Sequence, residues 1–318
     1  MKRTSTVATA AVAALALAAC GGGESEQAGG GGTDEVTVGV IPIVDVAPIY
    51  LGQQQGFFAE RDIELTLETS QGGAAIVPGV ASGQFDFGFS NMTSLLTAQT
   101  QDLPLQVTGA GVATTGDVDD DFGAIVAPAG SGIDDASDLS GRSVAVNTLN
   151  NIGDTTVRHT VEQAGGDPSD IEFVELGFPD MPAAVQEGRV DAAWMVEPFV
   201  TIATDQDAEI VASNFAATHE ELAVAAYFTS TELAESDPNL VDRFTEAMNA
   251  SLDYAQDNPE QAREILGSYT DIDSATAESL TLPEWPTEIN EESVQLLADL
   301  AVEHGLVESE PDVQALLP

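Results

Sequence analysis

A weak internal duplication restricts the fold more than any other feature of this sequence. Residues 80–88 and 185–193 each contain the apolar end of a helix, a Gly, and a short apolar run that follows an Asp. Two further pairs of segments keep the same order upstream, 36–40 with 143–147 and 62–67 with 170–175. A single match of this kind is weak, but three in one order indicate a repeated structural unit.

Each copy predicts the order strand, helix, strand, helix, strand. The predicted helices are 47–58 and 74–82 in the first copy, and 154–164 and 181–187 in the second. Alternation of strands and helices favours a parallel sheet with helices on both faces. Two copies therefore predict an α/β protein with two lobes of βαβ units.

Two apolar runs, 121–128 and 221–229, are predicted to cross between the lobes. The second lobe is then an insertion into the first. The predicted domains are lobe 1 over 35–128 plus 222–318, and lobe 2 over 129–221. Helical periodicity over 239–255, 259–266 and 291–304 predicts that the C-terminal part completes lobe 1 with helices.

Residues 1–19 have the pattern of an export signal. Lys2 and Arg3 precede a run of small apolar residues over 7–19, which is shorter than the roughly 18 residues that cross a bilayer. Leu17-Ala18-Ala19-Cys20 resembles a bacterial lipobox, in which the Cys is acylated; ordinary cleavage beside an incidental Cys is the alternative. We expect a lipid on Cys20, a flexible glycine-rich linker over 20–34, and a body held at the extracytoplasmic face of the cell membrane.

Composition excludes several classes of function. Cys20 is the only cysteine, and His159, His219 and His304 lie far apart, so neither a metal centre nor a Ser-His-Asp triad is supported. With 54 acidic and eight basic residues, the formal net charge is −46, so binding to nucleic acid or to an anionic membrane surface is disfavoured. Adaptation to saline surroundings and drift in a lysine-poor proteome explain this charge equally well. We expect a monomer.

The carboxyl ends of the predicted strands locate a binding site for a small molecule. Ligands of open α/β sheets bind beyond these ends. Applied to both copies, this rule predicts two facing sets of loops and a cleft between them. The candidate ligand-binding residues are Val44, Asp45, Gly72, Gly73, Ser90, Asn91, Asn147, Asn151, Asp154, Thr155, Trp194 and Glu197.

Several of these residues also have a purely structural interpretation. Asp45 and Asp154 stand where helices begin and can be N-caps. Gly72 and Gly73 permit a tight turn, or let backbone amides approach a ligand. Trp194 can stack on a ligand or pack on a helix. Asn91 is interpreted as a cleft residue, so its replacement by alanine should weaken ligand binding and spare thermal stability.

Four segments resemble a known family. They are Pro48–Gly52 with Gly56-Phe57-Phe58, 82–88, 138–146, and 188–194 running into Glu197-Pro198-Phe199. With these segments the chain resembles the substrate-binding lipoproteins of ABC importers for nitrate, sulfonates, taurine and the pyrimidine precursor of thiamine. The resemblance implies the type II periplasmic-binding-protein fold with a hinge and a central cleft, no catalysis and no cofactor. It also implies two partners, a permease and its ATPase.

The acidic loops favour one kind of ligand. Arg158 is the only basic side chain near a candidate loop, whereas Asp45, Asp154, Asp180 and Glu197 place negative charge around the predicted cleft. A carboxylate beside an anion weakens its binding by like-charge repulsion. An aminopyrimidine or an amino sulfonate is therefore favoured over nitrate or bicarbonate.

Two alternatives to a role in import are an enzyme of this fold and a ligand sensor. Some relatives of this fold build the thiamine pyrimidine from their own histidine and pyridoxal phosphate, with a cysteine-rich iron site. That chemistry needs a lysine and several cysteines, and after the signal this chain has no lysine and only Cys20. A surface protein that senses a ligand with the same two lobes is the other alternative.

Overall fold

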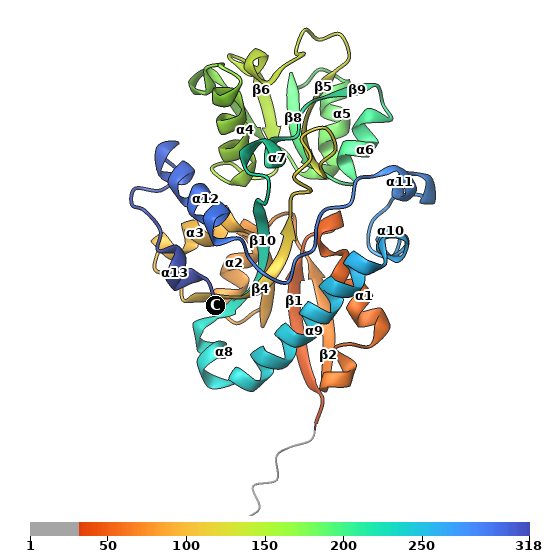
Figure 1. Cartoon of the computed structure of the whole chain (residues 1–318), viewed down its shortest axis with the longest axis vertical. Helices are drawn as coiled ribbons and strands as arrows, with labels where there is room; N and C mark the ends of the chain where they lie inside the picture. The colour runs from red at the N-terminus through yellow and green to blue at the C-terminus, as the bar shows by residue number, and fades with distance from the viewer. Residues whose placement is uncertain (1–31) are drawn as a thin grey trace, which may run out of the picture. The chain divides into compact units, whose positions relative to one another are not determined.

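The computed structural model describes residues 32–318. The predicted signal peptide, Cys20 and most of the predicted linker therefore lie outside the described residues. Residues Thr33–Pro318 form one compact unit that contains two five-stranded sheets (Figure 1). We call each sheet with its covering helices a lobe, and number the lobes in chain order.

The two sheets have equivalent strand orders. Sheet 1 has the order β2 (Ile63–Thr69), β1 (Asp34–Val40), β3 (Phe87–Asn91), β10 (Ala223–Ser230), β4 (Leu105–Ala113). Sheet 2 has the order β7 (Glu172–Glu175), β6 (Ser143–Val146), β8 (Ala192–Val196), β5 (Gly123–Pro128), β9 (Ala208–Ala212). In each sheet the first strand of the duplicated unit lies between the second and third, parallel to both. The duplication and the α/β class predicted from the sequence are thus confirmed.

Helices cover both faces of each sheet. Lobe 1 begins with α1 (Ala47–Gln55), α2 (Gly73–Ala81) and α3 (Met92–Thr100); lobe 2 has α4 (Ile152–Gln163), α5 (Met181–Gln186), α6 (Phe199–Thr204) and α7 (Asn214–Thr218). After β10 come α8 (Thr231–Ser236), α9 (Pro238–Asp257), α10 (Pro259–Leu266), α11 (Ser274–Ser279), α12 (Glu291–Glu303) and α13 (Val313–Leu316). Short 3-10 helices are Val44–Val46, Ala59–Arg61, Ala136–Leu139, Pro168–Asp170 and Phe178–Asp180. All seven helices predicted from the sequence are present.

The two apolar runs predicted as crossings are strands, which corrects the sequence analysis. Residues 123–128 form β5, which pairs antiparallel with β8, and residues 223–230 form β10, which pairs antiparallel with β3. Each strand arrives from the other lobe at the edge where the parallel strands end, so it must run against them. The sheets are therefore mixed rather than parallel, and β5 pairs within sheet 2 although it was expected in lobe 1. The other domain bounds stay a prediction.

The crossings themselves are the segments that precede these strands, 114–122 and 213–222. They lie side by side, since the backbone N–H of Thr114 donates to the carbonyl of Leu222 at 3.1 Å. Asp121 ties them further, because its carboxylate accepts from the Thr114 hydroxyl at 2.5 Å and from the backbone N–H of Ala216 at 3.0 Å. These paired segments form the connection between the lobes.

One Asp in each copy explains the repeated sequence signature. The Asp86 carboxylate accepts from the backbone N–H of Thr37 at 2.8 Å, while its own N–H donates to the Thr37 carbonyl at 2.9 Å. Asp191 does the same with Ser143, at 2.9 Å and 3.0 Å. Each Asp thereby fixes the start of the third strand against the first. The strand ends that follow are positioned by these bonds.

The C-terminal part of the chain packs back on lobe 1. The Phe244 ring of α9 stacks on Phe87 of β3, with ring centroids 3.8 Å apart. Phe87 and Phe89 share this face, whereas Phe85 lies against Gly79 of α2 on the other face. Covering both faces buries the apolar residues of the central strands, which is the dominant stabilising contribution in such a fold.

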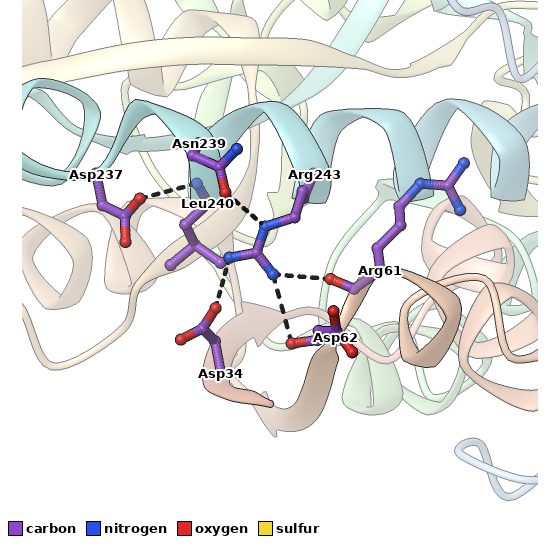
Figure 2. A network of polar contacts seen from close by, with 7 residues as sticks. All are labelled: Asp34, Arg61, Asp62, Asp237, Asn239, Leu240 and Arg243. Carbon is purple, nitrogen blue, oxygen red and sulfur yellow. Dashed lines mark hydrogen bonds and ion pairs between the residues drawn. The ribbon is translucent and has the colours of Figure 1, made fainter. Parts of the chain in front are cut away.

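An arginine joins α9 to the beginning of sheet 1. Figure 2 shows the Arg243 guanidinium between the Asp34 carboxylate and the backbone carbonyls of Arg61 and Asp62. The Arg61 carbonyl accepts at 2.7 Å. Asn239, one turn earlier on the helix, accepts from the Arg243 Nε at 3.0 Å. The guanidinium thus holds the helix to the strand and to the turn that precedes β2.

Across residues 32–318, the helices are all too short or too polar to cross a membrane.

Candidate ligand-binding cleft

The strand ends of the two lobes meet across a cleft. The backbone N–H of Val44, after β1, donates to the carbonyl of Glu197, after β8, at 3.0 Å. The Asn151 amide of lobe 2 donates to the Ser94 hydroxyl of lobe 1 at 2.8 Å, and both groups are buried. These contacts join the carboxyl ends of β1 and β3 to those of β6 and β8. The structure therefore describes the two lobes in direct contact at their strand ends.

A cavity of about 250 Å³ lies at one side of this cleft. Its walls come from the loops after β1, β2 and β7 and from α6, and they are Ile41, Pro42, Ile43, Thr69, Ser70, Gln71, Gly177, Phe178, Pro179, Asp180 and Phe199. The Phe178 and Phe199 rings are nearly parallel, with centroids 5.9 Å apart. Space for a small molecule is thus present where both lobes contribute residues.

Seven buried polar atoms on the strands or segments that adjoin the cleft have no hydrogen-bond partner among residues 32–318. We call them the unpaired set. They are Asp45 Oδ1, Ser90 Oγ, Thr93 Oγ1, Asn147 Oδ1, Trp194 Nε1, Asn214 Oδ1 and Tyr227 OH. An unpaired buried polar atom costs about 1–3 kcal/mol, so a concentration of them beside a cleft indicates groups that a ligand would satisfy.

Asp45 stands out within the unpaired set because it is an acid. Its side chain is 3% exposed, and burial raises the pKa of the Asp45 carboxyl from 3.8 to about 7, with a further contribution from the charge of Asp121. The N-cap interpretation of Asp45 is wrong, since α1 is capped at Val46 and Asp45 lies in the 3-10 turn before it. The carboxyl therefore has no capping role to explain its burial.

Three tyrosines and a tryptophan surround this acid. Tyr227 is 1% exposed, and burial together with the charge of Asp45 raises the pKa of its hydroxyl. The Tyr269 hydroxyl donates to the Ile43 carbonyl at 3.0 Å, and its ring stacks on Tyr50 with centroids 4.0 Å apart. The Trp285 indole donates to the backbone carbonyl of Asp45 at 3.2 Å. The loop that carries Asp45 is thus held by the turn after α10 and by the C-terminal segment.

The start of α4 uses three predicted site residues for helix formation. Asn151 is the N-cap, three residues before the predicted start, and its side-chain oxygen accepts from Ile152 N at 2.9 Å. Asp154 completes a capping box by accepting from the backbone N–H of Asn150 and Asn151. Thr155 donates to the Asn151 carbonyl at 2.8 Å. Their polar atoms are used within the protein, and contact of these three with a ligand stays a prediction.

Glu197 contacts lobe 1 through its backbone carbonyl and the C-terminal segment through its side chain. Its carboxylate accepts from the backbone N–H and the hydroxyl of Thr201, at 3.0 Å and 2.8 Å. It also accepts from the backbone N–H of Thr281, which lies in the C-terminal segment, at 3.2 Å. These bonds hold lobe 2 against that segment and occupy both carboxylate oxygens.

The remaining predicted residues shape the cleft. A methyl group on Gly72 would lie 3.1 Å from the Asn147 amide nitrogen and 3.2 Å from the Thr148 hydroxyl of the other lobe. On Gly73 it would lie 2.1 Å from the Ser90 hydroxyl. Trp194 is 2% exposed and packs on Gly153 of α4, as its structural interpretation predicts, while its indole N–H belongs to the unpaired set.

Asn91 caps a helix, so its expected substitution phenotype changes. Its side-chain oxygen accepts from the backbone N–H of Ser94 at 2.9 Å, at the start of α3. Replacing Asn91 with alanine is therefore expected to lower the free energy of unfolding by about 0.5–2 kcal/mol, measured by urea denaturation. Asn91→Ser, which keeps a capping oxygen, should lose less; equal stability of Asn91→Ala and the wild type would contradict the capping role.

Sequence reasoning did not identify Thr93, Asn214 and Tyr227. Tyr227 lies inside an apolar strand and pairs with Phe89, so in the sequence it is indistinguishable from a core aromatic. Asn214 donates to the Thr156 hydroxyl of α4 at 2.6 Å and leaves its oxygen in the unpaired set. The one sequence signal that could have identified these residues is a polar group inside an otherwise apolar run.

All six arginines of the described part form bonds within the protein, away from the unpaired set. Their partners are carboxylates or backbone carbonyls: Arg61 with Phe57 and Glu246, Arg142 with Asp191, Arg158 with Pro168, Arg189 with Glu187, Arg243 with Asp34, and Arg263 with Ala277 and Leu280. Within residues 32–318, no cluster of three or more His, Cys, Asp or Glu side chains could hold a metal ion.

Two mixed α/β lobes joined by a paired crossing, with a cleft at the strand ends, define the type II periplasmic-binding-protein fold. A family model described as NMT1/THI5 like matches residues 43–262, which is more than half of the chain. The chain belongs to the NMT1/THI5-like family. The resemblance and the fold class inferred from the sequence are therefore confirmed.

Three known proteins are similar to this chain, two in sequence and one in fold. A 4-amino-5-hydroxymethyl-2-methylpyrimidine phosphate synthase of Legionella pneumophila is 24% identical over 69% of this chain and 68% of its own length. A formylaminopyrimidine-binding protein of Halalkalibacterium halodurans is 24% identical over 57% of this chain and 52% of its own length. The alkanesulfonate-binding protein SsuA of Xanthomonas axonopodis pv. citri, bound to MOPS, has a TM-score of 0.75 at 17% identity and covers 89% of this chain and 98% of its own.

Proposed function

We propose that this chain is the extracytoplasmic solute-binding component of an ABC importer, which captures a small solute between its lobes and delivers it to a permease with its ATPase. The observation that carries the proposal is the unpaired set, which draws polar atoms from both lobes at one closed cleft. A rigid lobe on each side and a paired crossing between them suit closure about a hinge. We expect the protein to act as a monomer.

The unpaired set favours a solute that donates hydrogen bonds. Asp45 Oδ1, Asn147 Oδ1 and Asn214 Oδ1 accept, while the Trp194 indole is the one member that can only donate. Nitrate and sulfonate oxygens need donors, whereas an amino group or a ring N–H needs acceptors. An aminopyrimidine therefore fits this inventory better than a simple anion. The binding protein for formylaminopyrimidine among the relatives is consistent with that choice.

Calorimetric titration with an aminopyrimidine, taurine and nitrate tests the proposal. We expect the aminopyrimidine to bind in a one-to-one complex and nitrate to bind weakly. Tight binding of nitrate or taurine with none of the aminopyrimidine would contradict the choice of solute. Absence of binding by every small solute, including any retained during purification, would contradict the binding function itself.

The synthase names of relatives raise an enzymatic alternative. In the synthases that this fold resembles, catalysis needs a lysine for pyridoxal phosphate and a group of cysteines. Lys2 is the only lysine and Cys20 the only cysteine of this chain. We therefore propose binding without catalysis. Formation of a pyrimidine phosphate by the purified chain, measured by mass spectrometry, would contradict this proposal.

Lipid on Cys20 would keep the protein at the membrane after export. Replacing Cys20 with serine removes the thiol that is acylated, so we expect the variant to appear in the soluble fraction rather than the membrane fraction. Cell fractionation with immunodetection measures this, and Ser25→Ala in the same segment is the control. A Cys20→Ser variant that stays with the membrane would show that another element anchors the protein.

A further inference from the structure

We propose that Asp45, together with Tyr227, selects the charge of the solute, so that the cleft takes a small nitrogen base in its cationic form. This inference rests on the proposed binding function and goes beyond it by naming the group that distinguishes a cation from a neutral solute or an anion.

The first argument is that the protein supplies no countercharge to Asp45. Asp45 Oδ1 is buried without a hydrogen-bond partner in the described part of the chain. The six arginines there are bonded elsewhere, and the sequence has no lysine after Lys2. A buried carboxyl without a paired cation keeps its proton to higher pH, and its ionised form needs a partner that the described part of the chain does not provide. A cationic solute supplies it.

The second argument comes from the groups that face this acid. The Tyr269 hydroxyl and the Trp285 indole N–H already donate hydrogen bonds to backbone carbonyls, and the Tyr50 ring is stacked on Tyr269. Tyr227 OH remains unpaired among residues 32–318, and its oxygen can accept a second N–H from the same solute. A carboxylate oxygen and a phenol oxygen together complement a group with two N–H donors, such as an amidinium or a protonated aminopyrimidine edge.

The third argument concerns Asp121, the other acid that acts on Asp45. Its carboxylate is bonded to the Thr114 hydroxyl and to the backbone N–H groups of Thr115, Phe122 and Ala216. It is therefore occupied, but its charge adds negative potential at Asp45. Both acids disfavour an anion in this part of the cleft and favour a cation.

Proton linkage gives the proposal a distinctive signature. The pKa of Asp45 lies at about 7 because of its burial, so a proton and a cationic solute compete for the carboxylate near neutral pH. For a solute whose own charge does not change, affinity should rise about tenfold from pH 6 to pH 8, as the carboxyl becomes ionised. A neutral solute would show no such rise.

Three isosteric probes test the selection: benzamidinium, benzamide and benzoate. They share a planar ring and differ in charge, and benzamidinium keeps its charge across this pH range. Calorimetric titration of the wild-type chain is expected to give the order benzamidinium, benzamide, benzoate from tightest to weakest. Only benzamidinium should bind more tightly at pH 8 than at pH 6.

Variants then assign the effect to the two residues. Asp45→Asn should weaken benzamidinium binding by about 10- to 100-fold and abolish its pH dependence, and Tyr227→Phe should weaken it by about 3- to 10-fold. Asp242→Asn removes an exposed charge on α9, outside the cleft, and should change affinity less than twofold. Thermal unfolding of each variant confirms that it is folded.

Benzoate or benzamide binding as tightly as benzamidinium would overturn the proposal, and so would an unchanged affinity of Asp45→Asn. Failure of all three probes would overturn it as well. Each of these results leaves the binding function itself to be judged by the aminopyrimidine titration, so the two failures are distinguishable.

Discussion

Replacing Gly72 with leucine is expected to weaken solute binding by about 5- to 150-fold while leaving the protein folded. Gly72 has an extended backbone, with φ −174° and ψ 161°, which any residue can adopt. A methyl group there would already approach Asn147 and Thr148 of the other lobe to 3.1 Å and 3.2 Å. A leucine side chain extends further and would hold the lobes apart.

The size of this effect follows from the cost of overpacking. Forcing extra carbon atoms into a closed contact costs about 1–3 kcal/mol, and this cost falls on the closed state alone. Apparent affinity falls by the same factor as the population of the closed state. Calorimetry with the aminopyrimidine measures the loss.

Gly267→Leu is the matched control for the Gly72→Leu substitution. A methyl group on Gly267 has only the Glu264 carbonyl nearby, at 3.8 Å, and the residue lies outside the cleft. We expect the Gly267→Leu variant to bind the aminopyrimidine with the affinity of the wild type. Unchanged affinity in Gly72→Leu would contradict closure as the basis of binding.

In the absence of ligand, the protein is expected to lose stability as pH rises from 5 to 8, and Asp45→Asn should remove much of this loss. The pKa of Asp45 is about 7 in the folded protein because of burial, and 3.8 is its ordinary value. The folded state therefore holds this proton to higher pH than the unfolded chain does. The stabilisation is complete below pH 3.8 and is lost as pH rises through 7.

The whole shift corresponds to about 4 kcal/mol in the free energy of unfolding, of which about 3 kcal/mol is lost between pH 5 and pH 8. Burial also raises the pKa of Asp121, Asp154 and Glu197, so some loss with pH should persist in the variant. Urea denaturation at pH 5 and pH 8 measures the difference, with Asp180→Asn as an exposed control. Equal pH dependence in Asp45→Asn and the wild type would show that Asp45 is not the buried acid responsible.

Local sequence patterns predicted the duplicated units well. The Gly and Asp that close each second helix and open each third strand recur because Gly83 and Gly188 adopt positive φ, at 73° and 65°, and because Asp86 and Asp191 bond back to the first strand. Strand direction could not be read in the same way. An apolar run such as 123–128 looks alike whether it is a crossing or a buried antiparallel strand.

The candidate site was predicted only in part for a related reason. The strand-end rule located Asp45, Ser90 and Asn147, which remain unpaired in the described part of the chain. Asn91 and Asn151 follow strands in the same way, yet they cap α3 and α4. An Asn that caps a helix and an Asn that meets a ligand have the same sequence context, and only the placement of the backbone N–H groups separates them.

Small-angle X-ray scattering tests most directly whether the lobes close on a solute. The Cys20→Ser protein is measured with and without saturating aminopyrimidine, next to the Gly72→Leu variant at the same occupancy. We predict that the radius of gyration of the Cys20→Ser protein falls on binding, while that of the Gly72→Leu variant stays larger. An unchanged radius in a complex that calorimetry shows to be saturated would contradict capture by closure.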